Sequence, residues 1–318
     1  MSKNVLVTAT GYSIYCQKAK QLLEQNGVNV IENPHGRPFT QEELLQVVGD
    51  IDGVVAGVDT WDETIFQKAP RLKVIARFGV GVDNIDLQSA AAHGIAVSNA
   101  RGMNSGSVAE MAIALMLSCL RNVPNLNRST REGAWERFMG RDLTGMCVGL
   151  LGFGDIARKV AKKLSGFDVK LIAYDLYPNM ELAKELNTEM VSMDEVLAKA
   201  DIVSMHLPSL PETQHIMNAE TFAKMKPGSV FINTARGALV DESALFNALT
   251  GGRLLAAASD VYESEPAGTE NPLFELDTFI ATPHTAAETY ATCENVGLMT
   301  AQALLDVFNG KNPENRLN

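Results

Sequence analysis

Short apolar runs rich in β-branched residues alternate along the chain with segments in which apolar residues recur every three or four positions. The first pattern predicts buried strands, and the second predicts amphipathic helices. Strands that alternate with helices imply crossover connections, and therefore parallel sheets with helices on both faces. The sequence thus predicts an α/β protein.

In the first part of the chain we expect a strand at Asn4–Thr8 and a helix at Ser13–Asn26, which Gly27 is well placed to end. A capping box of Thr40 and Glu43 predicts the start of the next helix. Further strands are expected at the apolar runs Val54–Ala56, Val74–Arg77 and Ile95–Asn99. This part of the chain therefore predicts one complete alternating series.

A long helix is predicted from about Asn104 to Asn122, opened by a second box at Ser107 and Glu110. The polar, arginine-rich stretch Asn125–Leu143 that follows is expected to be irregular. A second alternating series starts at Met146, and a final helix is expected from about Ala286 to Phe308. Its strands are predicted in MCVGLLG, VKLIAYD, DIVSMHLP, SVFINTA, LLAAASD and TFIATP.

Two such series in 318 residues predict two domains, each with its own core. If the final helix returns to the first domain, the chain crosses between the domains near Ala100 and near Glu288. The predicted domains are therefore residues 1–99 together with 288–318, and residues 100–287.

Charge and composition narrow the classes of function. The formal net charge is −11 and the sequence pI is about 5.0, which argues against nucleic acid as a partner. The four cysteines are scattered without metal-ligand or redox spacing, so no metal site is expected. The N-terminus does not resemble a signal peptide, and no apolar run reaches the length of a membrane span. A cytoplasmic protein without a membrane partner is the resulting prediction.

A glycine-rich motif directly follows the predicted strand Cys147–Leu151 and opens a predicted helix. In this context Gly152 allows a tight turn, Gly154 lets the backbone approach a pyrophosphate, and the small Ala157 permits close packing of helix on strand. Asp175 ends the next strand, where a carboxylate can bind the ribose hydroxyls and would repel a 2′-phosphate. The motif predicts an NAD site, and a purely structural glycine turn is the alternative.

Three polar residues follow predicted strands in the second half: Arg236, Glu265 and His284. Histidine can give a proton to a carbonyl oxygen, and a neighbouring carboxylate orients its ring and favours its protonated form. Arginine provides a planar, bidentate donor for a substrate carboxylate. Together the three residues form a chemically complete set for reducing a 2-oxo acid, although each alone could be an ordinary loop or surface residue.

At this point the chain resembles the D-isomer-specific 2-hydroxyacid dehydrogenase family, especially its phosphoglycerate-dehydrogenase-like members. The resemblance covers nearly the whole chain in order and spacing. It is carried by ARFGVGVDNIDL (76–87), NSGSVAEMAIALML (104–117), VGLLGFGDIA (148–157), VSMHLPSLPET (203–213), MKPGSVFINTARGALVDESAL (225–245), SDVYESEP (259–266) and TPHTA (282–286).

The resemblance implies a flavodoxin-like substrate domain, a Rossmann NAD-binding domain, and NAD as the cofactor. It implies that Arg236 anchors the substrate carboxylate, that Glu265 pairs with the histidine, and that His284 is the acid/base. The turn Gly79-Val80-Gly81 would donate backbone N–H groups to the same carboxylate. The implied cofactor contacts are Gly152, Gly154, Asp155, Ile156, Asp175, His206, Pro208, Thr213, Thr234, Ala235 and Asp260.

The chain departs from the phosphoglycerate branch at GVDTWDET (57–64). Members of that branch resemble one another here in carrying an arginine that helps to hold the substrate phosphate. Here Val58 and Asp59 take that place; Asp59 would repel a phosphate, and Arg37 could compensate. Phosphoglycerate is therefore a doubtful substrate, and hydroxypyruvate, glyoxylate or a related 2-oxo acid fits equally.

The resemblance also implies a homodimer formed through the long helix after Asn104 and the arginine-rich segment behind it. An NADH-sensing, corepressor-like binding protein is the alternative function, because such proteins share the fold and keep the three catalytic residues. A related hydrolase or formate-oxidising enzyme would need pocket residues or insertions that the sequence does not show.

Overall fold

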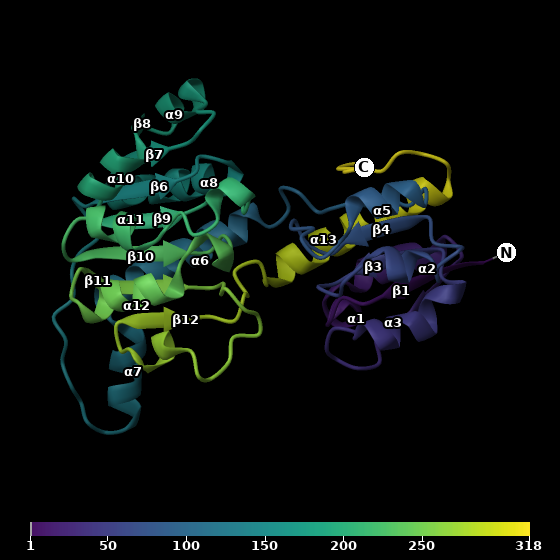
Figure 1. The fold of residues 1–318 in the computed structure, drawn as a ribbon, viewed down its shortest axis with the longest axis horizontal. Coiled ribbons are helices and arrows are strands. Elements are labelled where there is room, and N and C mark those ends of the chain that lie inside the picture. Colours follow the sequence, from purple (N-terminus) through teal and green to yellow (C-terminus); the bar gives the residue numbers. More distant parts are fainter. Residues whose placement is uncertain (1) are drawn as a thin grey trace. The chain divides into compact units, whose positions relative to one another are not determined.

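The computed structural model describes residues 2–318, which divide into two compact units. The first unit extends to Asn104 and resumes with Ala287–Asn318, and the second is Ser105–Ala286. Each unit contains one sheet with helices packed against it (Figure 1).

The sheet of the first unit is fully parallel, with five strands in the order β2-β1-β3-β4-β5. This is the 2-1-3-4-5 order of flavodoxin-like folds. The strands are β1 (Lys3–Val7), β2 (Val28–Ile31), β3 (Gly53–Ala56), β4 (Val74–Arg77) and β5 (Ala96–Ser98).

Alternate side chains of these strands enter two separate cores, one on each face of the sheet. Leu6, Val54 and Ile75 pack with α3 (Gln41–Val47), α4 (Glu63–Phe66) and α5 (Leu87–Ala92). Val5, Val55 and Val74 pack with α1 (Tyr12–Tyr15), α2 (Gln17–Gln25) and α13 (Tyr290–Phe308). The last helix of the chain thus forms part of the first unit, against α2 and β4.

The sheet of the second unit has seven parallel strands in the order β12-β11-β10-β9-β6-β7-β8. Counted from β6, this is the 3-2-1-4-5-6 order of dinucleotide-binding Rossmann folds with one strand added. The strands are β6 (Cys147–Leu151), β7 (Lys170–Tyr174), β8 (Thr188–Met190), β9 (Ile202–Met205), β10 (Ser229–Asn233), β11 (Leu254–Ser259) and β12 (Phe279–Ala281).

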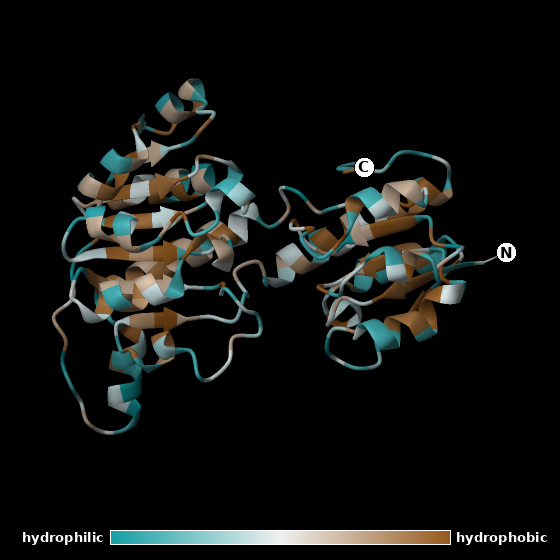
Figure 2. Ribbon diagram, viewed as in Figure 1, coloured by the Kyte–Doolittle hydropathy of each residue, from teal (hydrophilic) through white to brown (hydrophobic). Residues whose placement is uncertain are grey.

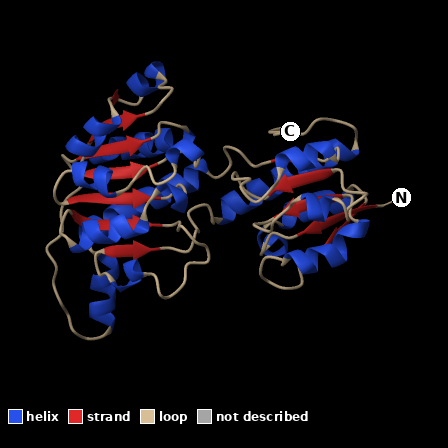
Figure 3. Cartoon of the chain, viewed as in Figure 1, coloured by secondary structure: helices blue, strands red, loops and turns tan. Residues whose placement is uncertain are grey.

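Helices cover both faces of this second sheet, as Figure 3 shows. On one face Val230 and Ile232 pack with α6 (Ser105–Arg121) and α8 (Asp155–Leu164). On the other face Phe231 packs with α10 (Met193–Lys199), α11 (Ala219–Lys224) and α12 (Glu242–Thr250). Because both faces are covered, the strands are apolar along their length and appear brown in Figure 2. The predicted α/β class and both implied folds are confirmed.

Several predicted helix boundaries were wrong. The helix expected over Ser13–Asn26 breaks at Cys16 into α1 and α2. Helix α6 begins at Ser105, so Ser107 and Glu110 lie inside it and form no capping box at its start; Glu110 instead pairs with Lys163 of α8 at 2.6 Å. The box of Thr40 and Glu43 is confirmed at the start of α3.

Part of the stretch expected to be irregular is helix α7 (Val123–Arg131). Its side chains are held by a distant part of the same unit: Asn125 Nδ2 donates to the carbonyl oxygen of Asp277, and Arg128 pairs with the carboxylate of Asp277 at 2.7 Å. The short strands β2 and β8 and the helix α9 (Met180–Glu185) complete the two units. Strands β2 and β8 were not among the predicted elements.

Among the described residues, no single helix has both the length and the apolar character of a membrane span. Helices α6 and α7 together have this length and apolar composition, but a break between them bends the pair by 62°.

Candidate active site

The glycine-rich turn lies between β6 and α8 in the second unit. Gly152 has φ +96°, and a Cβ at this position would lie 2.7 Å from the carbonyl oxygen of His206. Only glycine fits there, because other residues are strained at this φ and because their Cβ would clash with the backbone after β9. The turn is therefore packed tightly against the neighbouring strand end.

The N-terminus of α8 remains open. Gly154 is its N-cap, no side chain caps the helix, and a Cβ on Gly154 would meet nothing within 4 Å. Asp155 in the first turn pairs with Arg158, while Ile156 packs partly buried against the core. Ala157 is fully buried, as its packing role requires. The uncapped N–H groups and the helix dipole fit a pyrophosphate.

The carboxylate of Asp175 lies directly beside this turn. Its Oδ2 accepts a hydrogen bond from the Phe153 N–H at 2.7 Å, and its Oδ1 accepts one from the Tyr177 N–H at 2.9 Å. Asp175 thus braces the glycine-rich turn, and its remaining lone pairs can still accept from hydroxyl groups. Leu176 and Tyr177 are exposed and bring no cation to this position.

His206, Pro208 and Thr213 lie on the loop after β9. The ring of His206 contacts the Ser204 hydroxyl at 2.9 Å, and Thr213 Oγ1 donates to the Pro208 carbonyl oxygen at 2.7 Å. Burial lowers the pKa of His206 to about 4, so its ring is neutral at pH 7. A neutral imidazole suits a wall beside a cofactor better than it suits a proton donor.

Thr234 and Ala235 follow β10. Thr234 is only 7% exposed, and its hydroxyl finds no hydrogen-bond partner within the described chain. Ala235 is held by a hydrogen bond from its N–H to Asn233 Oδ1 at 3.0 Å. An unpartnered buried hydroxyl and an uncapped helix N-terminus in the same unit are the features that fit a bound dinucleotide.

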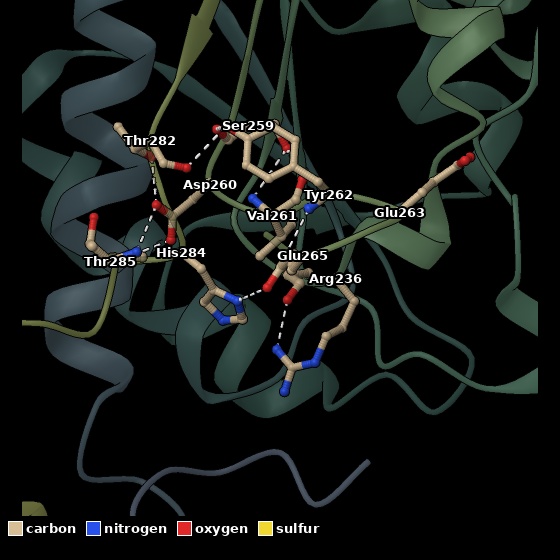
Figure 4. Close-up of polar contacts among 12 residues, drawn as sticks. Arg236, Ser259, Asp260, Val261, Tyr262, Glu263, Glu265, Thr282, His284 and Thr285 are labelled. Carbon is tan, nitrogen blue, oxygen red and sulfur yellow. Dashed lines mark hydrogen bonds and ion pairs between the residues drawn. The ribbon is translucent and has the colours of Figure 1, made fainter. Parts of the chain in front are cut away.

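The three catalytic candidates come together after β10, β11 and β12 (Figure 4). His284 Nδ1 lies 2.6 Å from Glu265 Oε2, and the other oxygen of Glu265 accepts from the Tyr262 N–H at 2.9 Å. In the close-up the Arg236 side chain extends beside Glu265. Arg236 Nη1 donates to the carbonyl oxygen of Ala235 at 2.7 Å.

The charge state of Glu265 follows from these contacts. Burial alone would raise the pKa of its carboxyl group, but the hydrogen bonds from His284 and from the Tyr262 N–H, with the charge of Arg236, lower it below the usual value. Glu265 is therefore a carboxylate at neutral pH. It fixes the His284 ring through Nδ1, which leaves Nε2 as the nitrogen that can exchange a proton.

Asp260 holds the loop that carries His284. Its side chain is fully buried, and Oδ1 accepts from the Thr282 hydroxyl at 2.5 Å and from the Thr285 N–H at 3.0 Å. Oδ2 accepts from the Ala286 N–H at 2.8 Å. His284 itself adopts a left-handed φ of +54°, which an ordinary loop would not favour without such anchoring. The expected contact of Asp260 with nicotinamide stays a prediction.

Gly237 and Tyr262 pack beside the catalytic candidates, and sequence reasoning missed both. A Cβ on Gly237 would lie 1.9 Å from the backbone carbonyl of Tyr262, so the backbone after Arg236 lies directly on the segment that leads to Glu265. The Tyr262 hydroxyl donates toward the carbonyl oxygens of Ser259 and Thr282 at 3.1 and 3.0 Å. The glycine after Arg236 was the only local signal for this close packing.

The remaining substrate candidates, Gly79, Val80 and Gly81, belong to the first unit and follow β4. In the same unit Asp59 is only 3% exposed, and its Oδ1 accepts from the Phe39 N–H at 2.5 Å. The carboxylate is thus turned into the unit, and the expectation that Asp59 repels a substrate phosphate stays a prediction. Arg37 forms a bidentate pair with Glu43 at 2.7 and 2.9 Å. Val58 is exposed.

Among the described residues, no group of three or more His, Cys, Asp or Glu side chains is arranged to hold a metal ion.

Comparison with known proteins shows the family to which the chain belongs. The chain is 40% identical over 305 residues to a D-3-phosphoglycerate dehydrogenase of Archaeoglobus fulgidus, which covers 95% of this chain and 57% of that protein. It spans only about half the length of similar enzymes from Mycobacterium tuberculosis. A hydroxypyruvate reductase of Thermotoga maritima is 38% identical over 287 residues, covering 89% of this chain and 92% of that protein.

Among solved structures, the apo form of D-lactate dehydrogenase from Escherichia coli matches with a TM-score of 0.89 at 27% identity, covering 99% of this chain and all of that one. A family model described as the NAD binding domain of D-isomer specific 2-hydroxyacid dehydrogenase matches residues 113–286. The chain therefore belongs to the D-isomer-specific 2-hydroxyacid dehydrogenase family, and its second unit contains the NAD-binding domain of that family.

Proposed function

We propose that the protein is an NAD-dependent oxidoreductase that interconverts a small 2-oxo acid and its D-2-hydroxy acid. The observation that carries this proposal is the 2.6 Å contact between His284 Nδ1 and Glu265 Oε2, with Arg236 beside it, in a domain of the NAD-binding family. An acid/base held by a carboxylate, next to a cation for the substrate carboxylate, is the arrangement that this reaction needs.

His284 is the proposed acid/base. NADH, when bound, would supply the hydride for C2 of the oxo acid, and the carbonyl oxygen would then need a proton. With Nδ1 held by Glu265, protonated His284 gives that proton from Nε2 and recovers it in the reverse direction. Glu265 stays ionised and stabilises the positive charge on the ring.

Arg236 is the proposed anchor for the substrate carboxylate. Its guanidinium carries five N–H donors in a planar fork, and Nη1 donates to the Ala235 carbonyl oxygen. Two of them can bind a carboxylate side by side, which fixes the orientation of C2. The turn Gly79-Val80-Gly81 is a second proposed contact for the carboxylate.

The proposed cofactor contacts divide by the part of NAD that they serve. The turn Gly152–Ile156 would bind the pyrophosphate, Asp175 the adenosine ribose, and the His206–Thr213 loop the path of the adenosine. Thr234, Ala235 and Asp260 would lie toward the nicotinamide. Since Asp175 would face a 2′-phosphate with like charge, we propose NAD rather than NADP.

The substrate is proposed to lack a phosphate. Val58 is the exposed residue after β3, and the one arginine of the nearby 33–40 segment, Arg37, is already paired with Glu43. Relatives are named for hydroxypyruvate, glyoxylate and phosphoglycerate, so the comparison alone leaves all three classes open. Hydroxypyruvate and glyoxylate carry no phosphate, so neither needs a cation beside Val58.

A panel of 2-oxo acids tests the proposal through NADH consumption: glyoxylate, hydroxypyruvate, phosphohydroxypyruvate, pyruvate and branched-chain acids. We expect one unphosphorylated acid to be preferred and the rate to fall about a hundredfold or more in His284→Ala. His93→Ala is the matched control, because His93 also pairs with a glutamate, Glu63, at 3.1 Å but lies in the first unit. Tight NADH binding without turnover on the whole panel would instead favour the sensor function.

We also propose that the protein is a homodimer. The segment after α7 exposes Trp135, Phe138 and Met139, which are large apolar side chains of the kind that interfaces cover. Light scattering coupled to size exclusion should give twice the 34.4 kDa mass of the chain. A monomer mass at micromolar concentration would exclude it. The cytoplasmic location stays a prediction.

A further inference from the structure

The turn Phe78–Gly81, which follows β4 in the first unit, has every one of its carbonyl oxygens occupied by a donor from the same unit. The Phe78 oxygen accepts from Arg77 Nη1 at 2.6 Å, the Gly79 oxygen from the Ala100 N–H at 2.8 Å, the Val80 oxygen from Asn99 Nδ2 at 2.7 Å, and the Gly81 oxygen from Arg77 Nε at 3.0 Å. Each carbonyl oxygen of the turn therefore already has a donor from its own unit.

In contrast to its carbonyl oxygens, two of the backbone N–H groups of the turn have no hydrogen-bond partner among the described residues. The Gly79 N–H donates to the Arg77 carbonyl oxygen at 2.9 Å, so it is already in use. For the N–H groups of Val80 and Gly81 there is no acceptor among the described residues. Two successive amides without an acceptor, next to carbonyl oxygens that already bond other donors, favour an anion.

Arg77 is the residue that produces most of this arrangement. Its guanidinium bonds both ends of the turn, lies 3.4 Å from the Ala56 carbonyl oxygen at the end of β3, and would be only 3.1 Å from a Cβ on Gly79. The planar fork fits this set of carbonyl oxygens, which the single ammonium of lysine cannot reproduce. The guanidinium also places a fixed positive charge against the turn.

We propose that Arg77 is a positioning residue for substrate binding: it holds the carbonyl oxygens of the turn inward, so that the Val80 and Gly81 amides face the substrate carboxylate. Asn99 serves the same purpose at Val80, through one hydrogen bond. This inference rests on the proposed function, since it names how one of the proposed carboxylate contacts is built. Arg77 itself does not need to touch the substrate.

Steady-state kinetics with Arg77→Met tests the inference. Releasing the turn removes a carboxylate contact that is made equally in the ground and transition states, so the KM of the preferred 2-oxo acid should rise about tenfold or more while kcat changes less. The KM of NADH should be unchanged. Oxamate, a non-reacting carboxylate analogue, should lose affinity by a similar factor. Guanidinium ion at non-denaturing concentration should restore part of the loss.

Two further variants separate this role from a general loss of folding. Arg77→Lys keeps the charge without the fork, and we expect it to resemble Arg77→Met. Arg71→Met is the matched control: Arg71 precedes the same strand and pairs with Asp52 at 2.7 Å, so the KM of the acid should stay at the wild-type value.

The outcomes distinguish this inference from the proposed function. If the wild type reduces a 2-oxo acid but its KM is the same in Arg77→Met, the inference is wrong and the proposed function stands. Equal rises in the KM of the acid and of NADH, or full activity of Arg77→Lys, would also overturn it. A wild type that reduces no acid on the panel would overturn both.

Discussion

Alanine substitutions at the two glycines of the β6–α8 turn test stability and cofactor binding separately, because each adds one methyl group in a different environment. Gly152→Ala places a Cβ 2.7 Å from the His206 carbonyl oxygen in a backbone of φ +96°. Gly154→Ala places the Cβ in open space, at a φ of −76° that alanine readily adopts. The first variant should lose stability, and the second should lose only NADH affinity.

The expected magnitudes follow from these contacts. A left-handed backbone costs alanine about 1–2 kcal/mol, and overlap with packed atoms costs about 1–3 kcal/mol, so Gly152→Ala should lose about 2–5 kcal/mol. At about 2–4 °C per kcal/mol for a unit of this size, its melting temperature should fall by roughly 4–20 °C. Gly154→Ala changes the helix cap only, which should stay within about 1 kcal/mol. Its methyl group would stand where the pyrophosphate approaches, raising the Kd of NADH about tenfold or more.

Scanning calorimetry and NADH fluorescence titration measure the two effects in parallel. Wild-type NADH affinity in Gly154→Ala would refute the assignment of this turn to the pyrophosphate. A wild-type melting temperature in Gly152→Ala would refute the close approach of the turn to the chain at His206.

Two further predictions concern the His284 loop. Asp260→Asn keeps the shape of the buried side chain but cannot accept from all three donors. We therefore expect calorimetry to show a loss of about 2–4 kcal/mol in the free energy of unfolding, and kcat to fall. An unchanged kcat would show that Asp260 does not position His284. Glu265→Gln removes the carboxylate that holds the His284 ring, so we expect kcat/KM for reduction to fall about tenfold or more in steady-state kinetics. Because the pKa of Glu265 is lowered, its contribution to stability is present above about pH 4.3 and is lost in more acid solution. The gap in melting temperature between the wild type and Glu265→Gln should therefore shrink with acid, and a gap that widens would contradict the argument.

Features set by neighbouring residues could be predicted from the sequence. The glycine-rich turn after β6 and the capping box of Thr40 and Glu43 depend on contacts within a few positions, and both are found where the sequence places them. The three catalytic candidates follow strands of a parallel sheet, and such strand ends share one edge, so Arg236, Glu265 and His284 could be grouped in advance.

Features set by distant residues could not be predicted. Asp260 accepts from residues 22 to 26 positions further on, and Asn99 donates to a carbonyl oxygen 19 positions earlier. Helix α7 depends on Asp277, about 150 positions away. For Asp59, position in the sequence suggested a role toward substrate, while its burial depends on the 33–40 segment folding over it. Periodicity contains no information about such partners.

The direct test of the central claim follows the hydride and the proton together. The best substrate of the panel whose hydroxy acid is chiral, which excludes glyoxylate, is reduced with NADH carrying two deuteriums at C4, and the product is analysed by mass spectrometry and chiral chromatography. The account predicts a D-2-hydroxy acid that carries one deuterium at C2, formed by the wild type and almost absent with His284→Ala. Product of L configuration, product without deuterium at C2, or undiminished formation of product by His284→Ala would contradict it.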